Sequence, residues 1–449
     1  MEGLPAQGWE AELEGWLAPF LARLGRKTQR HWAPFYLKGL LLPGERKSIE
    51  PMAARVAPAD SQQLHHFVSA SPWATAPLED ELVRAADRLV GGADAVLVID
   101  DTALVKQGRH SVGVKRQYCG QLGKRANCQS LISLTLARAE VPVCVGLRLF
   151  LPEDWCADPK RREATGVPDG IEHRPKWRIA LDEIDRVLAS GARFGGVLAD
   201  AEYGKAAGFR AGLTERGLTY AVGILPTQKV YPVEVTLSQP APKATGRPRK
   251  HPVPSLASLE AAELIEAQPQ AFRSLSWRSG SKGPLQAEFA AVRIRVADGP
   301  VATGGQHLPG AEAWLVAEHR SSGEKKYYLC NHPAEMPLKT LAVAIKGRWV
   351  CEQMHQQMKD ELGLDHFEGR SWRGLHHHAL LCQLAFAFLQ HLRLGGKKNR
   401  DPDPSRAAAP AKPARHPPPH PGRAQPRPAA LPPLPAGLRS PPPPVNVAG

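Results

Sequence analysis

The sequence predicts an α/β protein in which a mixed sheet carries helices on both faces. Three strand-like segments come first, starting at residue 95, and helices and strands then alternate up to residue 224. This order is typical of a mixed sheet with flanking helices. A helical segment precedes the sheet, a β-rich insertion interrupts it, and a Pro-rich tail follows. The 449 residues are enough for two or three domains with a sizeable core.

Residues 1–92 are predicted to form a helical, DNA-binding domain. Apolar side chains such as Leu13, Leu17 and Leu24 recur at helical spacing. The segments 45–56 and 62–73 mix basic, His and aromatic residues, which suits a helical module that lies on a phosphate backbone. The alternative is a solvated helical cap on the core.

Residues 93–225 are predicted to be the first part of the α/β core. Apolar runs bounded by Gly, Pro and polar residues indicate the strands, and apolar residues at helical spacing indicate the helices. The expected strands are 95–100, 130–137, 142–150, 195–200 and 218–224, and the expected helices are 174–189 and 204–216. The first and fourth of these strands both end in Asp, and functional groups gather where the strands of such sheets end.

Residues 226–335 break this alternation and are predicted to form a β-rich insertion, with short strands at 288–296, 313–318 and 327–330. Residues 336–394 are expected to return to the core. They are predicted to form one long helix from Leu338 to about Leu362 and a second helix over 374–392.

Residues 395–449 are predicted to be a disordered tail rich in Pro and Arg. The segment from Asp401 to Gly449 holds 17 of the chain's 43 prolines and few aromatic or β-branched residues, so it is unable to bury a core. Its abrupt onset leads to the hypothesis that the original reading frame was lost here. Resequencing the locus tests this hypothesis.

The composition favours a polyanionic partner. The 58 Lys and Arg residues exceed the 44 Asp and Glu residues, for a formal net charge of +14. Charge alone does not separate a nucleic-acid partner from a merely cationic surface. The seven cysteines form no CxxC pair, so a reduced, cytoplasmic protein is expected rather than a disulfide framework or zinc knuckle. No signal peptide is expected, because Met1 to Glu14 is acidic and interrupted by Gly and Pro. No membrane contact is expected, because the longest apolar stretch, Ala379 to Leu389, is too short to span a bilayer.

Carboxylates at the ends of two apolar strands are the first candidate site residues. Asp100 and Asp101 end the strand at 95–100, and Asp200 ends the strand at 195–200. Carboxylates at the end of a buried strand are costly unless a metal, a cation or water receives them, although a strand that ends in a solvated turn explains them too. Neighbouring strand residues face opposite ways, so only one of the first pair is expected to face the site. Asp101 is preferred, with Asp100 as the alternative.

Glu352 is the third candidate acid. Arg348, Glu352 and Lys359 are four and seven residues apart, so a helix places them on one face. The two cations keep the carboxylate ionised and are suited to holding DNA phosphates. An ordinary surface ion pair is the alternative.

Several basic segments are candidate DNA contacts. Lys115 and Arg116 belong to a basic stretch that follows the first acids. Arg247 and Arg249, in a Gly-Arg-Pro-Arg-Lys run, resemble the core of a minor-groove AT hook, although a solvated linker also explains them. His376, His377 and His378 diverge on a helix, so they are expected to face DNA or solvent rather than one metal ion.

Together these segments resemble the DDE transposases of bacterial insertion sequences, which have an RNase H-like core. Within that family they resemble the group whose third acid lies in a Tyr-x2-Arg-x3-Glu-x6-Lys motif. Arg348, Glu352 and Lys359 match this motif in type and spacing, while Ile345 stands at the tyrosine position. Asp101 followed by Thr102 matches the first acid better than Asp100 does. Asp200 matches the second, and the 152 residues from Asp200 to Glu352 resemble members with a β-stranded insertion.

The resemblance implies a metal-dependent DNA strand transferase. Asp101, Asp200 and Glu352 would hold two Mg²⁺ ions, with Mn²⁺ able to substitute, for cleavage at inverted-repeat ends and strand transfer into target DNA. It also implies double-stranded DNA as partner, a homodimer in a synaptic complex, and bacterial cytoplasm as location. Trp277 of the insertion would stack on a flipped base, unless it is a core residue. The alternatives are an RNase H-like nuclease or resolvase, and a decayed transposase that only binds DNA.

Overall fold

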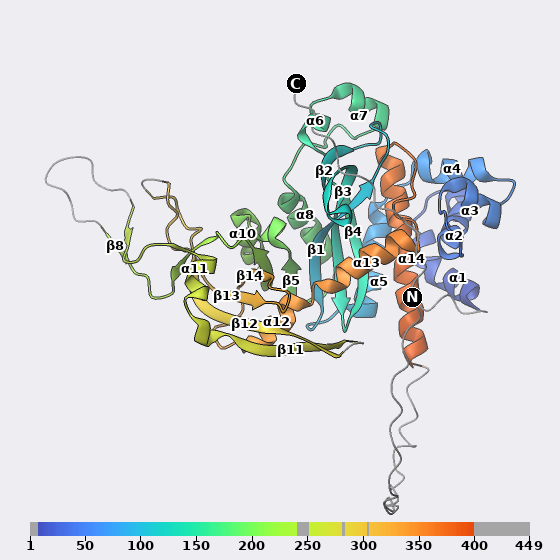
Figure 1. Cartoon of the computed structure of the whole chain (residues 1–449). Helices are drawn as coiled ribbons and strands as arrows, with labels where there is room; N and C mark the ends of the chain where they lie inside the picture. The colour runs from blue at the N-terminus through green and yellow to red at the C-terminus, as the bar shows by residue number, and fades with distance from the viewer. Residues whose placement is uncertain (1–7, 240–250, 281–282, 303–304, 399–449) are drawn as a thin grey trace, which may run out of the picture. The chain divides into compact units, whose positions relative to one another are not determined.

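The computed structural model describes residues 8–239, 251–280, 283–302 and 305–398 (Figure 1). These residues lie in one compact unit, Met1–Asn399. The first part of it is helical, as predicted. Its helices are α1 (Trp9–Leu21), α2 (Lys27–Leu41), α3 (Ile49–Val56), α4 (Ser61–Ser69) and α5 (Ala76–Val90).

A mixed sheet follows, which confirms the predicted fold class. Strand β1 lies between β3, with which it pairs antiparallel, and β5, with which it pairs parallel. Strand β6 continues the sheet parallel to β5, and β2 and β4 both pair antiparallel with β3. The strands of this part are β1 (Val96–Val105), β2 (Lys115–Cys119), β3 (Lys124–Arg138), β4 (Val141–Leu149), β5 (Gly196–Ala199) and β6 (Tyr220–Ile224).

Strand β1 is longer than predicted. The sequence placed its end at residue 100, but the strand continues through both Asp residues to Val105. The reason is its partner β3, which pairs with β1 without interruption from Val96 to Val105. The two carboxylates therefore lie inside a strand, on opposite faces of the sheet.

The segment after β6 is rich in strands, and these strands extend the core sheet. Strand β14 pairs antiparallel with β6, and β13, β12 and β7 follow in order (Figure 1). The elements of this segment are β7 (Lys229–Pro232), β8 (Leu237–Ser238), β9 (Val253–Pro254), β10 (Leu259–Glu260), α11 (Ala261–Glu266), β11 (Arg273–Gly280), β12 (Gly283–Val296), β13 (Glu312–His319) and β14 (Lys325–Cys330). Arg247 and Arg249 lie outside the described residues.

Helices cover both faces of the core sheet. Leu97 and Ile99 of β1 join the core cluster that includes Ile184 of α8, whereas Val98 joins a separate cluster with Leu341 and Cys351. The first face is thus covered by α8 and the second by α12 and α13. The remaining helices are α6 (Glu153–Cys156), α7 (Pro159–Thr165), α8 (Lys176–Ala189), α9 (Ala201–Gly204), α10 (Ala207–Glu215), α12 (Leu338–Lys346), α13 (Trp349–Asp360) and α14 (Trp372–Lys398).

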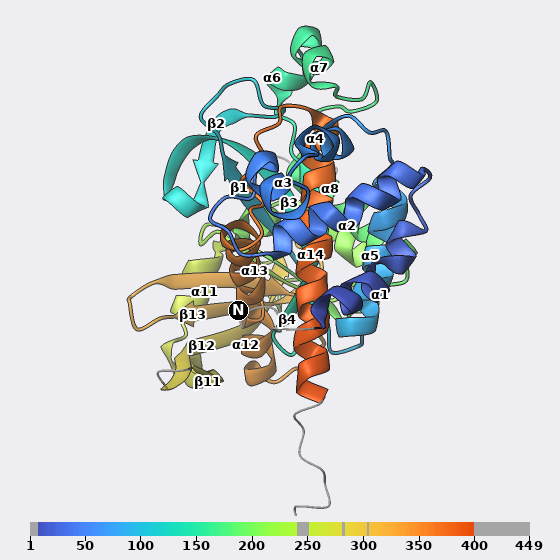
Figure 2. The same cartoon turned by 90° about the vertical axis from the view of Figure 1, so that its right-hand side faces the viewer.

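Helix α14 joins the N-terminal helices to the sheet. It packs on β4 of the sheet and on α2, α4 and α5, as the helix labelled α14 in Figures 1 and 2 shows. It runs to Lys398, past the predicted start of the tail at residue 395, and residues 399–449 lie outside the described residues. No helix in the described ranges is long and apolar enough to cross a membrane.

The predicted long helix from Leu338 to Leu362 is wrong, because two helices occupy this segment. Helix α12 ends at Lys346 and α13 begins at Trp349, with Gly347 at the junction. A Cβ atom on Gly347 would lie only 3.2 Å from Leu198 of β5. The glycine therefore lets the junction approach the sheet closely, next to the strand that leads to Asp200.

Candidate active site

Asp100 faces helix α13, which carries Glu352. Arg348, at the start of α13, donates from Nη1 to Asp100 Oδ2 at 2.5 Å. The thiol of Cys351 donates to the same oxygen at 3.1 Å. The buried carboxylate of Asp100 is therefore fixed by two side chains of one helix.

Asp101 faces the opposite side of the sheet. Lys176, the first residue of α8, pairs with its Oδ2, and the hydroxyl of Tyr203 in α9 donates to its Oδ1 at 2.5 Å. Burial raises the pKa of Asp101, although Lys176 and Tyr203 favour its ionised form.

Asp200 caps the N-terminus of α9 directly after β5. Its Oδ1 accepts hydrogen bonds from the backbone N–H groups of Glu202 at 2.9 Å and Tyr203 at 3.4 Å. Burial and the negative charge of Asp100 raise the pKa of Asp200 to about 6, against the opposing effect of Arg348. Tyr203 thus contacts two acids, Asp200 through its backbone and Asp101 through its side chain.

Glu352 lies one turn along α13 from Arg348. Its side chain is 60% exposed and its Oε1 accepts from Arg348 Nη2. Burial lowers the pKa of Arg348, but the negative charges near it, that of Asp100 first, raise it overall. Arg348 thus pairs with Asp100 and Glu352, and Asp200 lines one cleft with Arg348 and Glu352, while Asp101 lies on the opposite face of the sheet.

A cleft of about 470 Å³ opens beside this group. Its lining includes Asp200, Arg348 and Glu352, together with four further cations. These cations are Arg320, Lys325, Lys326 and Lys346. A concave surface that combines carboxylates with many cations has the chemistry expected of a site for a phosphate-rich substrate.

The donor set fits a hard divalent cation. Carboxylate oxygens are the ligands that Mg²⁺ prefers. The four carboxylates of Asp100, Asp101, Asp200 and Glu352 are paired with only two cations, because Arg348 pairs with both Asp100 and Glu352 and Lys176 pairs with Asp101. This set therefore has two more carboxylates than cations. Within the described part of the chain no three His, Cys, Asp or Glu side chains are arranged to hold a metal ion. In this conformation Arg348 lies between Asp100 and Glu352, and Lys176 holds Asp101.

The other residues that were predicted to contact DNA are not gathered at the cleft. Lys359 is buried at the end of α13, where it donates to Gln121 at 3.3 Å, and burial lowers its pKa. Lys115 pairs with Asp154 at 2.8 Å, and Arg116 is exposed on β2.

Trp277 is half-buried on β11. Its ring meets Phe289 edge-on, with centroids 5.7 Å apart, and the ammonium of Lys346 lies 4.4 Å from its centroid. The packing of Trp277 is that of a side chain at the edge of the insertion's core. Its predicted role on a flipped base stays a prediction.

The expectation that the three consecutive histidines face DNA or solvent is wrong for His377 and His378, which are buried. The two ring nitrogens of His377 lie 2.9 Å from the carbonyl oxygens of Val68 and Trp73, and a neutral ring donates to one of the two. His378 bonds to the hydroxyl of Tyr36. Burial lowers the pKa of both to about 4, so they are neutral parts of the contact between α14 and the N-terminal helices.

Lys176, Tyr203 and Cys351 contact the candidate acids but were not predicted from the sequence as site residues. The contacts of Lys176 and Tyr203 with Asp101 span 75 and 102 residues, so they depend on the packing of α8 and α9 against β1. The sequence did contain one indication that Tyr203 belongs to the site, because Tyr203 follows Asp200 by three residues in the same motif.

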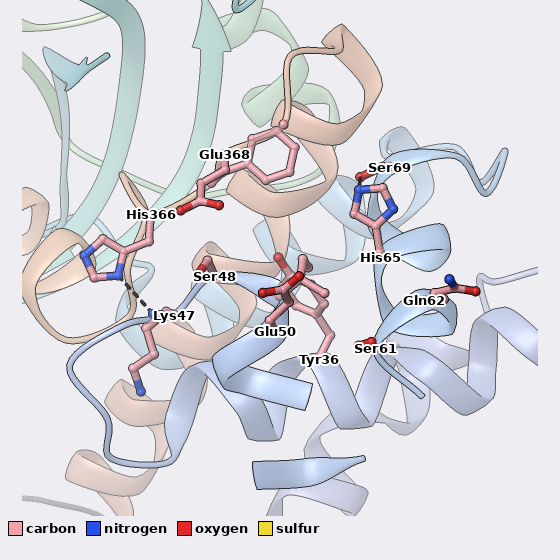
Figure 3. Close-up of a pocket in the computed structure, with 13 residues that line it drawn as sticks. Tyr36, Lys47, Ser48, Glu50, Ser61, Gln62, His65, Ser69, His366 and Glu368 are labelled. Carbon is pink, nitrogen blue, oxygen red and sulfur yellow. Dashed lines mark hydrogen bonds between the residues drawn. The ribbon is translucent and has the colours of Figure 1, made fainter. Parts of the chain in front are cut away.

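A larger cavity, of about 580 Å³, lies between α2, α3, α4 and the segment that precedes α14 (Figure 3). Glu50 and His65 face it from the N-terminal helices, and Glu368 faces it from the other side. The backbone N–H of Lys47 donates to His366 Nδ1 across one end at 3.1 Å. The lining acids Glu50 and Glu368 are not members of the Arg348 group, so this cavity is separate from the cleft above.

Two comparisons relate the chain to known proteins. The sequence model of the DDE superfamily endonucleases matches residues 19–284, which include Asp100, Asp101 and Asp200 but not Glu352. Over 182 residues the chain is 32% identical to the probable transposase for insertion sequence element IS701 of Microchaete diplosiphon. That alignment covers 40% of this chain and 45% of the relative, so the match spans less than half of either protein.

Proposed function

The chain belongs to the DDE superfamily endonucleases, and from this premise we propose that it is a transposase of an insertion sequence. It would cut DNA at inverted-repeat ends and join those ends to target DNA. The observation that carries the proposal is the pairing of Arg348 with Asp100 and Glu352, in a cation-lined cleft that Asp200 also lines.

Asp200 and Glu352 are the proposed metal ligands from β5 and α13. Asp101 is the proposed ligand from β1, because its Asp-Thr pair matches the family motif. Asp100 is the competing assignment, because it shares Arg348 with Glu352. When bound, two Mg²⁺ ions would supply an activated hydroxyl and charge stabilisation at the leaving oxygen, and Mn²⁺ would substitute.

Arg348 has two successive roles in this proposal. In the described conformation its guanidinium neutralises Asp100 and Glu352 and keeps the buried carboxylate of Asp100 paired. Once these acids are otherwise neutralised, the guanidinium is free to bind a phosphate of the DNA next to the cut. Tyr203 would keep Asp101 and Asp200 in fixed positions relative to each other.

The proposed partners are double-stranded DNA, as terminal inverted repeats and as target, and a second copy of the chain in a synaptic complex. The proposed location is the bacterial cytoplasm, in association with DNA. The net charge of +14 supports a polyanionic partner.

Substitution of the three acids tests the proposal. We expect Asp101→Asn, Asp200→Asn and Glu352→Gln each to abolish Mg²⁺-dependent cleavage of end DNA while DNA binding is largely retained, because each change removes a ligand but no DNA-contacting cation. A strand-transfer assay with paired ends measures both steps. Cleavage that persists in Glu352→Gln refutes its assignment, and cut products without joined products indicate a nuclease instead.

A further inference from the structure

The hairpin of β2 and the start of β3 is a basic, exposed element in contact with helix α13. We call residues 115–125 the basic hairpin; its turn is the short helix η1 (Gly120–Leu122). It carries Lys115, Arg116, Lys124 and Arg125 and contains no acidic residue. Strand β2 is the edge strand of the sheet, so one side of the hairpin has no neighbouring strand among the described residues.

The outer face of the basic hairpin places an aromatic ring among cations. Tyr118 pairs directly with Arg125 across the two strands, and Arg116 precedes it by two residues on the same face. Tyr118 is 68% exposed, and Leu122 at the turn is 44% exposed. Large apolar groups exposed on a strongly cationic element are typical of a surface that binds single-stranded nucleic acid.

The basic hairpin is fixed to the helix that carries Glu352. Lys359 of α13 donates to Gln121 in the turn at 3.3 Å. Lys359 follows Glu352 by seven residues, a helical rise of about 10 Å. At about 3.4 Å per nucleotide along one strand, this rise corresponds to roughly three nucleotides. A DNA strand held at Glu352 therefore reaches the basic hairpin within a few nucleotides of the cut.

We propose that the basic hairpin binds unpaired nucleotides next to the cleaved DNA end, with Tyr118 stacked on a base and Arg116 and Arg125 on the adjoining phosphates. Bases expose a π-face to an aromatic ring only when they are unstacked, which makes the ring selective for unpaired DNA. The cations bind the backbone without regard to sequence. This inference rests on the proposed function, because it takes DNA as the substrate.

The test compares two DNA probes with the full chain. One is a 20-base-pair blunt duplex, and the other is the same duplex with three unpaired nucleotides at one end, including 2-aminopurine. We expect the wild-type chain to bind the second probe more tightly and to quench its fluorescence. Tyr118→Ala should weaken that binding at least about fivefold and abolish the quenching, while Tyr118→Phe keeps both. Leu188→Ala, which trims a partly exposed side chain on α8, is the control.

Three outcomes overturn the inference while leaving the proposed function intact. Equal affinity of the wild-type chain for both probes is the first. The second is a Tyr118→Ala protein that binds and quenches as the wild type does. The third is a Tyr118→Ala protein that differs from the wild type only in self-association, which would assign the basic hairpin to a contact between copies of the chain. If the wild-type chain binds neither probe, the proposed function itself fails.

Discussion

Arg348 contacts two candidate acids at once, and this contact is the main residue-scale feature of the site. The helical spacing predicted its pairing with Glu352, because residues four apart share a helix face. Its bond to Asp100 spans 248 residues and depends on how α13 packs on β1. Local periodicity therefore predicted the pair with Glu352, whereas the pair with Asp100 is determined by tertiary packing.

The choice between Asp100 and Asp101 is open to a direct comparison. The proposed assignment predicts that Asp101→Asn loses Mn²⁺ binding, while Asp100→Asn retains it. Isothermal titration of each variant with Mn²⁺ measures this, with thermal unfolding as the check on folding. The reverse pattern assigns Asp100 as the ligand from β1.

The pKa of Asp200 predicts a pH-dependent metal affinity. Its carboxyl has a pKa of about 6 in the folded chain, against an ordinary value of 3.8. The folded state therefore holds this proton more tightly than the unfolded state does. The contribution of Asp200 to stability is greatest below pH 4 and is lost as pH rises through 6.

A metal ion requires the ionised carboxylate, so Mn²⁺ affinity should increase from about pH 5 to pH 7 and level off above that range. Calorimetric titrations at pH 5 and pH 7 measure the change. The Asp200→Asn protein lacks this ligand and should bind Mn²⁺ only weakly at both pH values. Equal affinities of the wild-type chain at the two pH values contradict the prediction.

At the scale of elements, the junction between α12 and α13 is held by the insertion. Glu318 of β13 is fully buried, and its carboxylate accepts from Lys346 at 2.7 Å, Arg320 at 2.8 Å and Tyr328 at 2.8 Å. Burial alone would raise the pKa of Glu318, but these bonds hold it below its usual value. Lys346 ends α12, two residues before Arg348. The buried carboxylate thus fixes the approach to the candidate site.

Removal of Lys346 should destabilise the fold and loosen α13. Lys346→Met leaves Glu318 buried with one cation fewer, which is expected to cost about 2–3 kcal/mol. Denaturant unfolding measures this cost, and hydrogen exchange should increase in residues 346–352. Arg293→Met is the matched control, because it breaks the more exposed pair with Glu312, worth less than about 1 kcal/mol. Equal losses in the two variants would show that the Glu318 cluster has no special role.

The two wrong predictions for elements have a common cause. From the sequence, β1 was predicted to end at its carboxylates, and one continuous helix was predicted from 338 to 362. The strand continues because β3 supplies ladder partners beyond Asp101, and the helix is interrupted at Gly347, which lies close to Leu198 of β5. Both features depend on neighbours distant in sequence, which local patterns do not contain. The strands at 288–296 and 327–330 were predictable, because a period of two is local.

At the scale of the whole molecule, one sheet runs from the core into the insertion, and α14 joins the N-terminal helices to it. Alternation of helices and strands predicted the fold class, whereas the pairing of β14 with β6 had no sequence signal. The cleft beside Arg348 lies where these parts meet, since β5, β6, β14, α12 and α13 all contribute to its lining. The candidate site therefore requires the folded unit as a whole.

The net charge of +14 predicts DNA binding that depends strongly on salt. Each phosphate contact releases counterions, so binding through six or more contacts should weaken by about a thousandfold or more between 50 and 200 mM NaCl. Fluorescence anisotropy with a labelled duplex measures the slope. An affinity that does not change over this range would exclude binding dominated by phosphate contacts.

The most direct measurement of the central claim is anomalous diffraction from crystals of this protein soaked in Mn²⁺. We predict at least one ion bonded to carboxylate oxygens of both Asp200 and Glu352, with one Asp of β1 completing the set and Arg348 displaced from Glu352. Ligand distances should be close to those of Mg²⁺ sites, about 2.1 Å. Crystals that show no ion there at saturating Mn²⁺, with Arg348 still bound to Asp100 and Glu352, would contradict it.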